Sequence, residues 1–136
     1  MNLVVLTGRL IKDCEVRKSE KNNSEYAVFN IAVNKNISKK KRETLLSEGK
    51  YVADLFNIII FGKYGTSISK YLKKGTYVTI EGVLNNYIKD NGTEKTIYNN
   101  VIANNVEFIS SKNHDGDSDN YNNFDELIEK YEEIIY

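Results

Sequence analysis

Alternating apolar and polar positions predict that most of this chain forms β-strands. In residues 26–35, Ala27, Phe29 and Ile31 fall on one face of an extended chain, which is the pattern of a half-buried strand. Residues 51–61 end in an unbroken apolar run, which is typical of a central strand. The other segments that we expect to be strands are residues 3–11, 76–87 and 96–109.

Turn and cap signals mark the connections between these strands. Asn91 followed by Gly92 is a strong hairpin signal, because both residue types tolerate positive φ. Ile68 and Leu72 lie four positions apart, which predicts a short helix over residues 66–73. The polar segments that we expect to be loops are residues 18–25 and 37–50.

The order strand, strand, strand, helix, strand, strand favours a small closed barrel, because closure removes exposed strand edges. We therefore predict an all-β fold with five strands and one short helix between strands three and four. A chain of 136 residues is within the usual range for a single domain.

Charge divides the chain into two parts. Residues 1–112 hold 18 Lys and Arg against 11 Asp and Glu, which is a net charge of +7. Residues 113–136 hold one basic and eight acidic residues, which is a net charge of −7. A basic body with an acidic appendage is typical of a protein whose body meets a polyanion.

Several functional classes are disfavoured by composition. The single Cys14 and the single His114 do not allow a disulfide framework or a multi-ligand zinc site within one protomer. No apolar run approaches the roughly 20 residues of a membrane span, and we see no signal-peptide pattern, so we expect a cytoplasmic protein without membrane contact. No catalytic constellation or cofactor motif is recognisable. We therefore expect a binding protein and not an enzyme.

Six short strings resemble, in order and spacing, those of bacterial single-stranded DNA-binding proteins. They are residues 6–10 (LTGRL), 29–34 (FNIAVN), 59–63 (IIFGK), 71–75 (YLKKG), 78–82 (VTIEG) and 106–108 (VEF). The resemblance extends over residues 2–109. It implies an oligonucleotide-binding (OB) barrel that assembles as a homotetramer and coats single-stranded DNA without sequence preference during replication, recombination or repair. Bacteriophages and plasmids also encode members of this family.

The resemblance implies particular stacking residues. Two of the family's four aromatic positions fall on Phe61 and Tyr87, whereas the other two fall on Leu55 and Ile37, which are not aromatic. Phe56 is a further candidate for DNA contact, with the core or a subunit interface as the alternative. Other tyrosines, including Tyr98, are expected mainly to pack on the sheet surface.

Basic residues that could neutralise phosphates lie in two kinds of place. A run of four occupies the predicted loop after the second strand, where a solvated loop is the alternative to DNA contact. Other candidates lie along the expected strands or just after the third. The full set of basic candidates is Arg9, Lys12, Lys35, Lys39, Lys40, Lys41, Arg42 and Lys63.

The acidic end consists of two segments beyond the expected domain of residues 1–109. Residues 110–123 have the composition of a polar acidic linker, and residues 124–136 form an acidic amphipathic segment. This acidic end departs from the usual end of the family, which is a run of aspartates closed by Pro-Phe. Its apolar residues, the candidates for partner binding, are Phe124, Leu127, Ile128, Tyr131, Ile134, Ile135 and Tyr136.

Three interpretations of this end remain open. It recruits replication or repair proteins, it docks on its own barrel or a neighbouring subunit, or it is a disordered solubilising end. For the whole chain, the alternative to DNA coating is a replication accessory or assembly subunit of primosomal type. Such a subunit would bind DNA weakly and recruit proteins through its tail.

Overall fold

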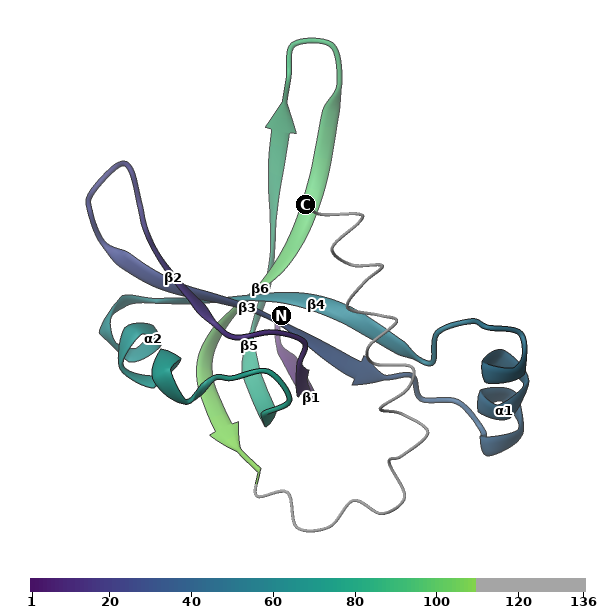
Figure 1. The fold of residues 1–136 in the computed structure, drawn as a ribbon. Helices are drawn as coiled ribbons and strands as arrows, with labels where there is room; N and C mark the ends of the chain where they lie inside the picture. The colour runs from purple at the N-terminus through teal and green to yellow at the C-terminus, as the bar shows by residue number, and fades with distance from the viewer. Residues whose placement is uncertain (110–136) are drawn as a thin grey trace.

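In the computed structural model, which describes residues 1–109, one sheet curls round until its strands meet (Figure 1). Its spatial order is β1-β5-β6-β4-β3-β2, and β1 also pairs with β3, which closes the barrel. This arrangement confirms the predicted OB barrel. The strands are β1 (Val4–Leu10), β2 (Glu15–Lys18), β3 (Glu25–Asn34), β4 (Ala53–Phe61), β5 (Tyr77–Asp90) and β6 (Lys95–Phe108).

The barrel closes where β1 approaches β3. Arg9 and Leu10 of β1 are in register with Ala32 and Ile31 of β3. Gly8 directly precedes this contact, and a Cβ atom at that position would lie 2.4 Å from the carbonyl oxygen of Ala32. The glycine therefore permits a backbone approach that a larger residue would block.

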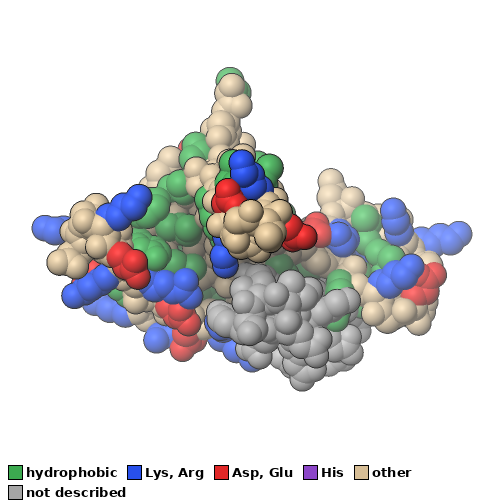
Figure 2. All heavy atoms as spheres, turned by 90° about the horizontal axis from the view of Figure 1, so that it is seen from above, with side chains coloured by type: hydrophobic (Ala, Val, Ile, Leu, Met, Phe, Trp, Pro, Cys, Tyr) green, Lys and Arg blue, Asp and Glu red, His purple; other side chains and the backbone are tan. Residues whose placement is uncertain are grey.

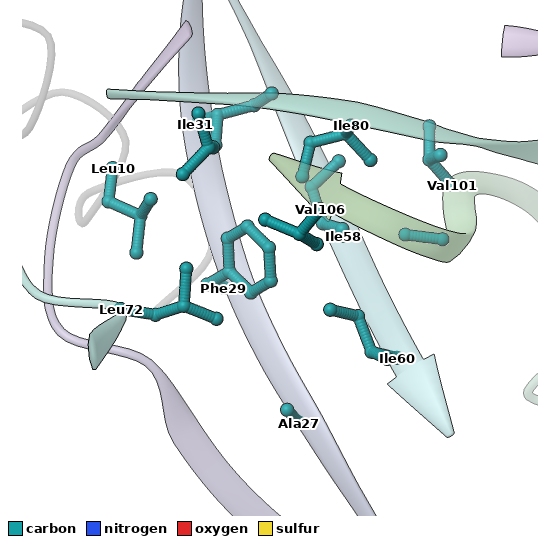
Figure 3. Close-up of a cluster of buried hydrophobic side chains, with 12 residues drawn as sticks. Leu10, Ala27, Phe29, Ile31, Ile58, Ile60, Leu72, Ile80, Val101 and Val106 are labelled. Atoms are coloured by element: carbon teal, nitrogen blue, oxygen red, sulfur yellow. The ribbon is translucent and has the colours of Figure 1, made fainter. Parts of the chain in front are cut away.

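The core is formed by the inward-facing side chains of the alternating strands. In Figure 3 the Phe29 ring lies at the centre, with Leu72 on one side and Ile58 and Ile60 on the other. Ile58 and Ile60 belong to β4, which pairs with both β3 and β6. The prediction that this apolar segment is a central strand is therefore confirmed.

A short helical segment follows β4, as predicted, but it begins four residues earlier. It consists of α2 (Gly62–Ile68) and a 3₁₀ turn, η1 (Ser69–Tyr71). The early start is possible because Gly62 has φ +80°, which lets the chain turn directly out of β4. The buried Leu72 then anchors the end of this segment in the core.

Two elements differ from the sequence-based expectation. The segment predicted to be a long loop contains α1 (Lys39–Ser47), which lies in an arm between β3 and β4 at the right of Figure 1. The side chain of Ser38 caps this helix by accepting a hydrogen bond from the Lys41 backbone N–H at 3.2 Å. The second difference is β2, a short exposed strand that pairs with β3 and adds a sixth strand to the five expected.

The predicted hairpin is confirmed and is longer than expected. β5 and β6 each have 14 residues and project beyond the barrel (Figure 1). At the tip, Asn91 Oδ1 accepts backbone N–H bonds from Thr93 and Glu94, and Gly92 has φ +92°. The predictions for the linker 110–123 and the acidic segment 124–136 lie outside the described residues.

Candidate nucleic-acid interface

One aromatic pair, formed by exposed Phe61 and half-buried Tyr26, lies where β4 ends. Phe61 is in register with Tyr26 of β3, and their ring centroids are 5.8 Å apart at 52°. The Phe61 side chain is 56% exposed, because β4 gives way to α2 directly after it. Phe61 is thus a surface aromatic residue and not part of the core.

A second aromatic pair lies on the β5–β6 hairpin. Tyr87 is in register with Tyr98, and their rings stack with centroids 5.2 Å apart and planes 18° apart. Their side chains are 48% and 42% exposed. Tyr87 was predicted from the sequence as a stacking residue, whereas Tyr98 was assigned mainly to surface packing. The structure brings the two together.

The strand ladders connect the two aromatic pairs across one continuous surface. Ile59 of β4 is in register with Val28 of β3 on one side and with Ile102 of β6 on the other. Ile102 is in turn in register with Val83 of β5. Because side chains alternate along each strand, these residues share a face with the aromatic pairs. We call this surface the outer face, and its members are Tyr26, Val28, Asn30, Asn57, Ile59, Phe61, Val83, Asn85, Tyr87, Tyr98, Asn100 and Ile102.

The outer face is neutral, and charge lies around it. None of the members named above is charged. Figure 2, which looks down on the projecting hairpin, shows apolar side chains gathered beside it toward β2, with Lys and Arg at both sides of the molecule. Such an arrangement can receive flat apolar bases at its centre and phosphates at its margins.

Phe56 lies on the opposite face of β4, in the core environment that the sequence left open as the alternative to DNA contact. It packs against the buried core cluster with Ile58 and Ile60, because the even-numbered side chains of β4 point inward. Leu55 has the opposite parity and is half-buried. Ile37, the fourth position implied by the resemblance, is half-buried in the arm that carries α1.

The four basic residues of the arm divide into two groups. Lys39, Lys40 and Lys41 are exposed on α1, and Figure 2 shows Lys and Arg side chains around this helix at the right. Arg42 is half-buried, and its guanidinium donates to the backbone oxygen of Lys35 at 3.1 Å. Arg42 therefore holds the helix against the end of β3, while the three lysines face solvent.

The other basic candidates are in different surroundings. Lys35 forms an ion pair with Asp54 on the adjacent strand. Arg9 donates to the backbone oxygen of Gly75 at 3.2 Å, and its guanidinium lies 4.7 Å from the ring centroid of Tyr77. These two side chains are thus already engaged in contacts within the barrel.

Two basic candidates remain, and they differ in exposure. Lys12 is half-buried just beyond β1. Lys63 is exposed two residues after Phe61. It is therefore the basic candidate nearest in sequence to an exposed aromatic residue of the outer face.

The part of the chain that the structure describes has neither a group of metal-ligating side chains nor a helix that could cross a membrane. Within residues 1–109, no three His, Cys, Asp or Glu side chains are grouped so that they could ligate a metal ion. No helix in this range has the length and apolar character needed to cross a membrane.

A closed OB barrel with aromatic pairs at the surface of one face is typical of barrels that bind single-stranded nucleic acids. Comparison with known families agrees, since the model of the single-strand binding protein family matches residues 1–109. The chain belongs to this family, which confirms the resemblance. Membership makes it a single-stranded DNA-binding protein and not an enzyme.

Individual relatives are similar over most of the chain. "Single-stranded DNA-binding protein 1" of Staphylococcus aureus (strain MSSA476) is 31% identical over 85% of this chain and 69% of its own length. "Single-stranded DNA-binding protein 2" of S. aureus (strain COL) is 32% identical, over 83% of this chain and 76% of its own. The "Single-stranded DNA-binding protein" of Oceanobacillus iheyensis is 32% identical, over 88% and 70%.

Proposed function

We propose that this protein coats single-stranded DNA exposed during replication, recombination or repair, with the bases laid on the outer face. The observation that carries this proposal is the presence of two aromatic pairs, half-buried Tyr26 with exposed Phe61 and exposed Tyr87 with exposed Tyr98, joined by a neutral surface. Stacking on such rings contributes roughly 1–3 kcal/mol per base and tolerates every base. The proposed location of this function is the cytoplasm.

Phe61 and Tyr87 are the proposed principal stacking residues, because both are about half exposed at opposite ends of the outer face. The exposed Lys39, Lys40 and Lys41 on α1, together with Lys63, are the proposed phosphate contacts. Each phosphate that a lysine neutralises steepens the dependence of log affinity on log salt by about 0.7.

The edge of β1 supports a second proposal, that the protein forms homo-oligomers. Among the described strand pairs, residues Val4 to Gly8 pair with β5 alone, and β3 joins β1 only at Arg9 and Leu10. Leu3 and Val5 are largely exposed beside this edge. A strand from a second copy would satisfy the edge and cover these side chains. The tetrameric state itself rests on the family.

The acidic segment 124–136 is proposed to recruit replication or repair proteins. Its apolar residues at helical spacing, combined with acidic neighbours, suit a groove lined with apolar and basic side chains. Docking on the protein's own barrel is the competing proposal. The primosomal-type alternative depends on weak DNA binding, which the two aromatic pairs do not favour.

DNA binding by the outer face can be tested by titration with a thymidine homopolymer. The chain has ten tyrosines and no tryptophan, so tyrosine fluorescence reports binding directly. We expect Phe61→Ala and Tyr87→Ala to weaken binding about tenfold each at about 100 mM salt. Tyr71→Ala is the matched control, because Tyr71 is 59% exposed on η1, outside the outer face. Equal losses of DNA affinity in all three variants would contradict the assignment of Phe61 and Tyr87 as stacking residues.

Deletion of residues 113–136 separates the two proposals for the acidic end. If the end recruits partners and competes with DNA for the basic body, the deletion raises DNA affinity at low salt and leaves the oligomer intact. Unchanged affinity together with a smaller oligomer, measured by light scattering, would favour docking of the end on a neighbouring subunit.

A further inference from the structure

Four asparagines lie in one row across the outer face. Asn30 of β3 is in register with Asn57 of β4, and Asn85 of β5 is in register with Asn100 of β6. The two pairs meet at the parallel β4–β6 ladder, where Asn57 and Asn100 directly precede the registered residues Ile58 and Val101. We call Asn30, Asn57, Asn100 and Asn85 the asparagine row.

Each pair in this row joins a buried asparagine to a half-exposed one. Asn30 is only 5% exposed, and its Nδ2 donates to Oδ1 of Asn57 at 3.1 Å. Asn100 is also 5% exposed, and its Oδ1 accepts from Nδ2 of Asn85 at 3.2 Å. The buried members thus fix the orientation of the half-exposed members. These bonds engage Oδ1 of Asn57 and Nδ2 of Asn85, and Nδ2 of Asn57 and Oδ1 of Asn85 take no part in them.

The position of the row is unusual for a surface whose only task is stacking. It lies beside the apolar row of Val28, Ile59, Ile102 and Val83, with an aromatic pair at either side. Asparagine is disfavoured in strands, and a buried amide loses hydration unless it is hydrogen-bonded. Apolar residues at these positions would extend the stacking surface without the loss of hydration that burial of an amide entails. Side-chain amides are, however, suited to the edges of bases, which carry both donors and acceptors.

We propose that the asparagine row hydrogen-bonds to the edges of bases stacked on the aromatic pairs, so that affinity depends on the identity of the pyrimidine. This proposal rests on the proposed placement of bases on the outer face. Binding of every sequence is retained, because stacking is common to all bases. The row adds a preference among them, with Asn57 and Asn85 as the residues that contact the base and Asn30 and Asn100 as positioning residues.

The test compares oligonucleotides of thymidine, deoxyuridine and deoxycytidine of equal length at one salt concentration. The backbones of these strands are alike, and thymine and uracil share a hydrogen-bonding edge that differs from the edge of cytosine. We expect thymidine and deoxyuridine strands to bind alike and to differ from deoxycytidine strands by about fivefold, the value of one net hydrogen bond.

Asn57→Leu and Asn85→Leu should each bring the ratio of the affinities for thymidine and deoxycytidine strands close to one. Asn99→Leu is the matched control, because Asn99 pairs with Asn86 on the opposite face of the same hairpin. It should leave the ratio unchanged. Asn57→Ala and Asn85→Ala replace the leucine variants if thermal unfolding shows that those do not fold.

Equal affinity of the intact protein for thymidine and deoxycytidine strands would overturn this proposal and leave DNA coating intact. A ratio that persists in the Asn57 and Asn85 variants would overturn it as well. Absence of binding to all three strands would instead contradict the proposed placement of DNA, so the two failures are distinguishable.

Discussion

Tyr87 and Tyr98 form a stacked pair on neighbouring strands, with their ring centroids 5.2 Å apart. The pair lies between the hairpin tip and the residues Val101 and Ile102 that pair with β4, and each tyrosine remains nearly half exposed. Tyr98 limits the motion of Tyr87 by covering one of its faces. A base that stacks on Tyr87 therefore meets a ring that is already positioned.

Replacement of Tyr98 should weaken DNA binding although sequence reasoning did not select this residue. We expect Tyr98→Ala to lower affinity for a thymidine homopolymer by about tenfold, within the range of one lost stacking contact. Tyr98→Phe keeps the ring and should bind nearly as well as the parent chain. The control is Ile97→Ala, because Ile97 is 63% exposed on the opposite face of the same strand. A comparable loss in Ile97→Ala would assign the effect to hairpin stability.

The arm between β3 and β4 should show a division of roles among its basic residues. Replacement of Lys39, Lys40 and Lys41 by glutamine should flatten the salt dependence by up to about 0.7 for each lysine in contact with a phosphate. Thermal stability should hardly change, since these side chains are exposed. Salt titrations at about 50 and about 300 mM measure the slope. An unchanged slope would exclude the arm from phosphate contact.

Replacement of Arg42 should affect the stability of the arm and not the salt dependence of binding, because its guanidinium donates a hydrogen bond to the Lys35 carbonyl oxygen. Arg42→Gln should lower the helical signal in circular dichroism and destabilise the arm by about 1 kcal/mol, the value of one net hydrogen bond. The triple lysine variant is its control. If Arg42→Gln flattened the salt slope and left the helix intact, Arg42 would be a phosphate contact.

Much of the barrel follows from local sequence pattern, because burial on one face imposes strict alternation on a strand. β3 and β4 show this most clearly, and their boundaries agree with the prediction to within two residues. α1 was missed because its sequence KKKRETLLS has only two apolar residues, so it lacks the periodic stripe of a packed helix. β2 has four exposed residues and is defined only by its pairing with β3.

The site was predictable in part for similar reasons. Phe61 and Tyr87 were selected through the family resemblance, and the parity of β4 separates Phe61 from Phe56. Tyr98 was not selected because its partner depends on the length of the turn. A two-residue turn at Asn91 and Gly92 would place Thr96 opposite Tyr87, whereas the ladder closes at Asp90 and Lys95 and places Tyr98 there.

Cys14 should make stability depend on pH in the alkaline range. Burial raises the pKa of its thiol from the ordinary 9.0 to about 11. Between these values the unfolded chain loses the proton while the folded chain keeps it, so deprotonation favours unfolding. The contribution of this thiol to stability is therefore complete below about pH 9 and falls as the pH rises toward 11.

Urea unfolding of the parent chain and of Cys14→Ala, at about pH 8 and about pH 10.5, tests this expectation. Because the two chains differ only at residue 14, the difference between their pH dependences isolates the thiol. The parent should lose more stability over this interval than the variant. Parallel losses would show that the thiol titrates alike in the folded and unfolded chains.

Closure of the barrel should depend on the absence of a side chain at Gly8. A Cβ atom there would lie 2.4 Å from the Ala32 carbonyl oxygen, and backbone atoms in a paired strand cannot move aside cheaply. We expect Gly8→Ala to destabilise the fold by about 3 kcal/mol, at the upper end for overpacking. Gly75→Ala is the control, because Gly75 has φ +86° but open space around it. We expect this substitution to lower the free energy of unfolding by about 1 kcal/mol. Urea unfolding of both variants measures the difference. Equal costs would mean that β1 can move away from β3 without loss, and that closure at Arg9 and Leu10 contributes little to stability.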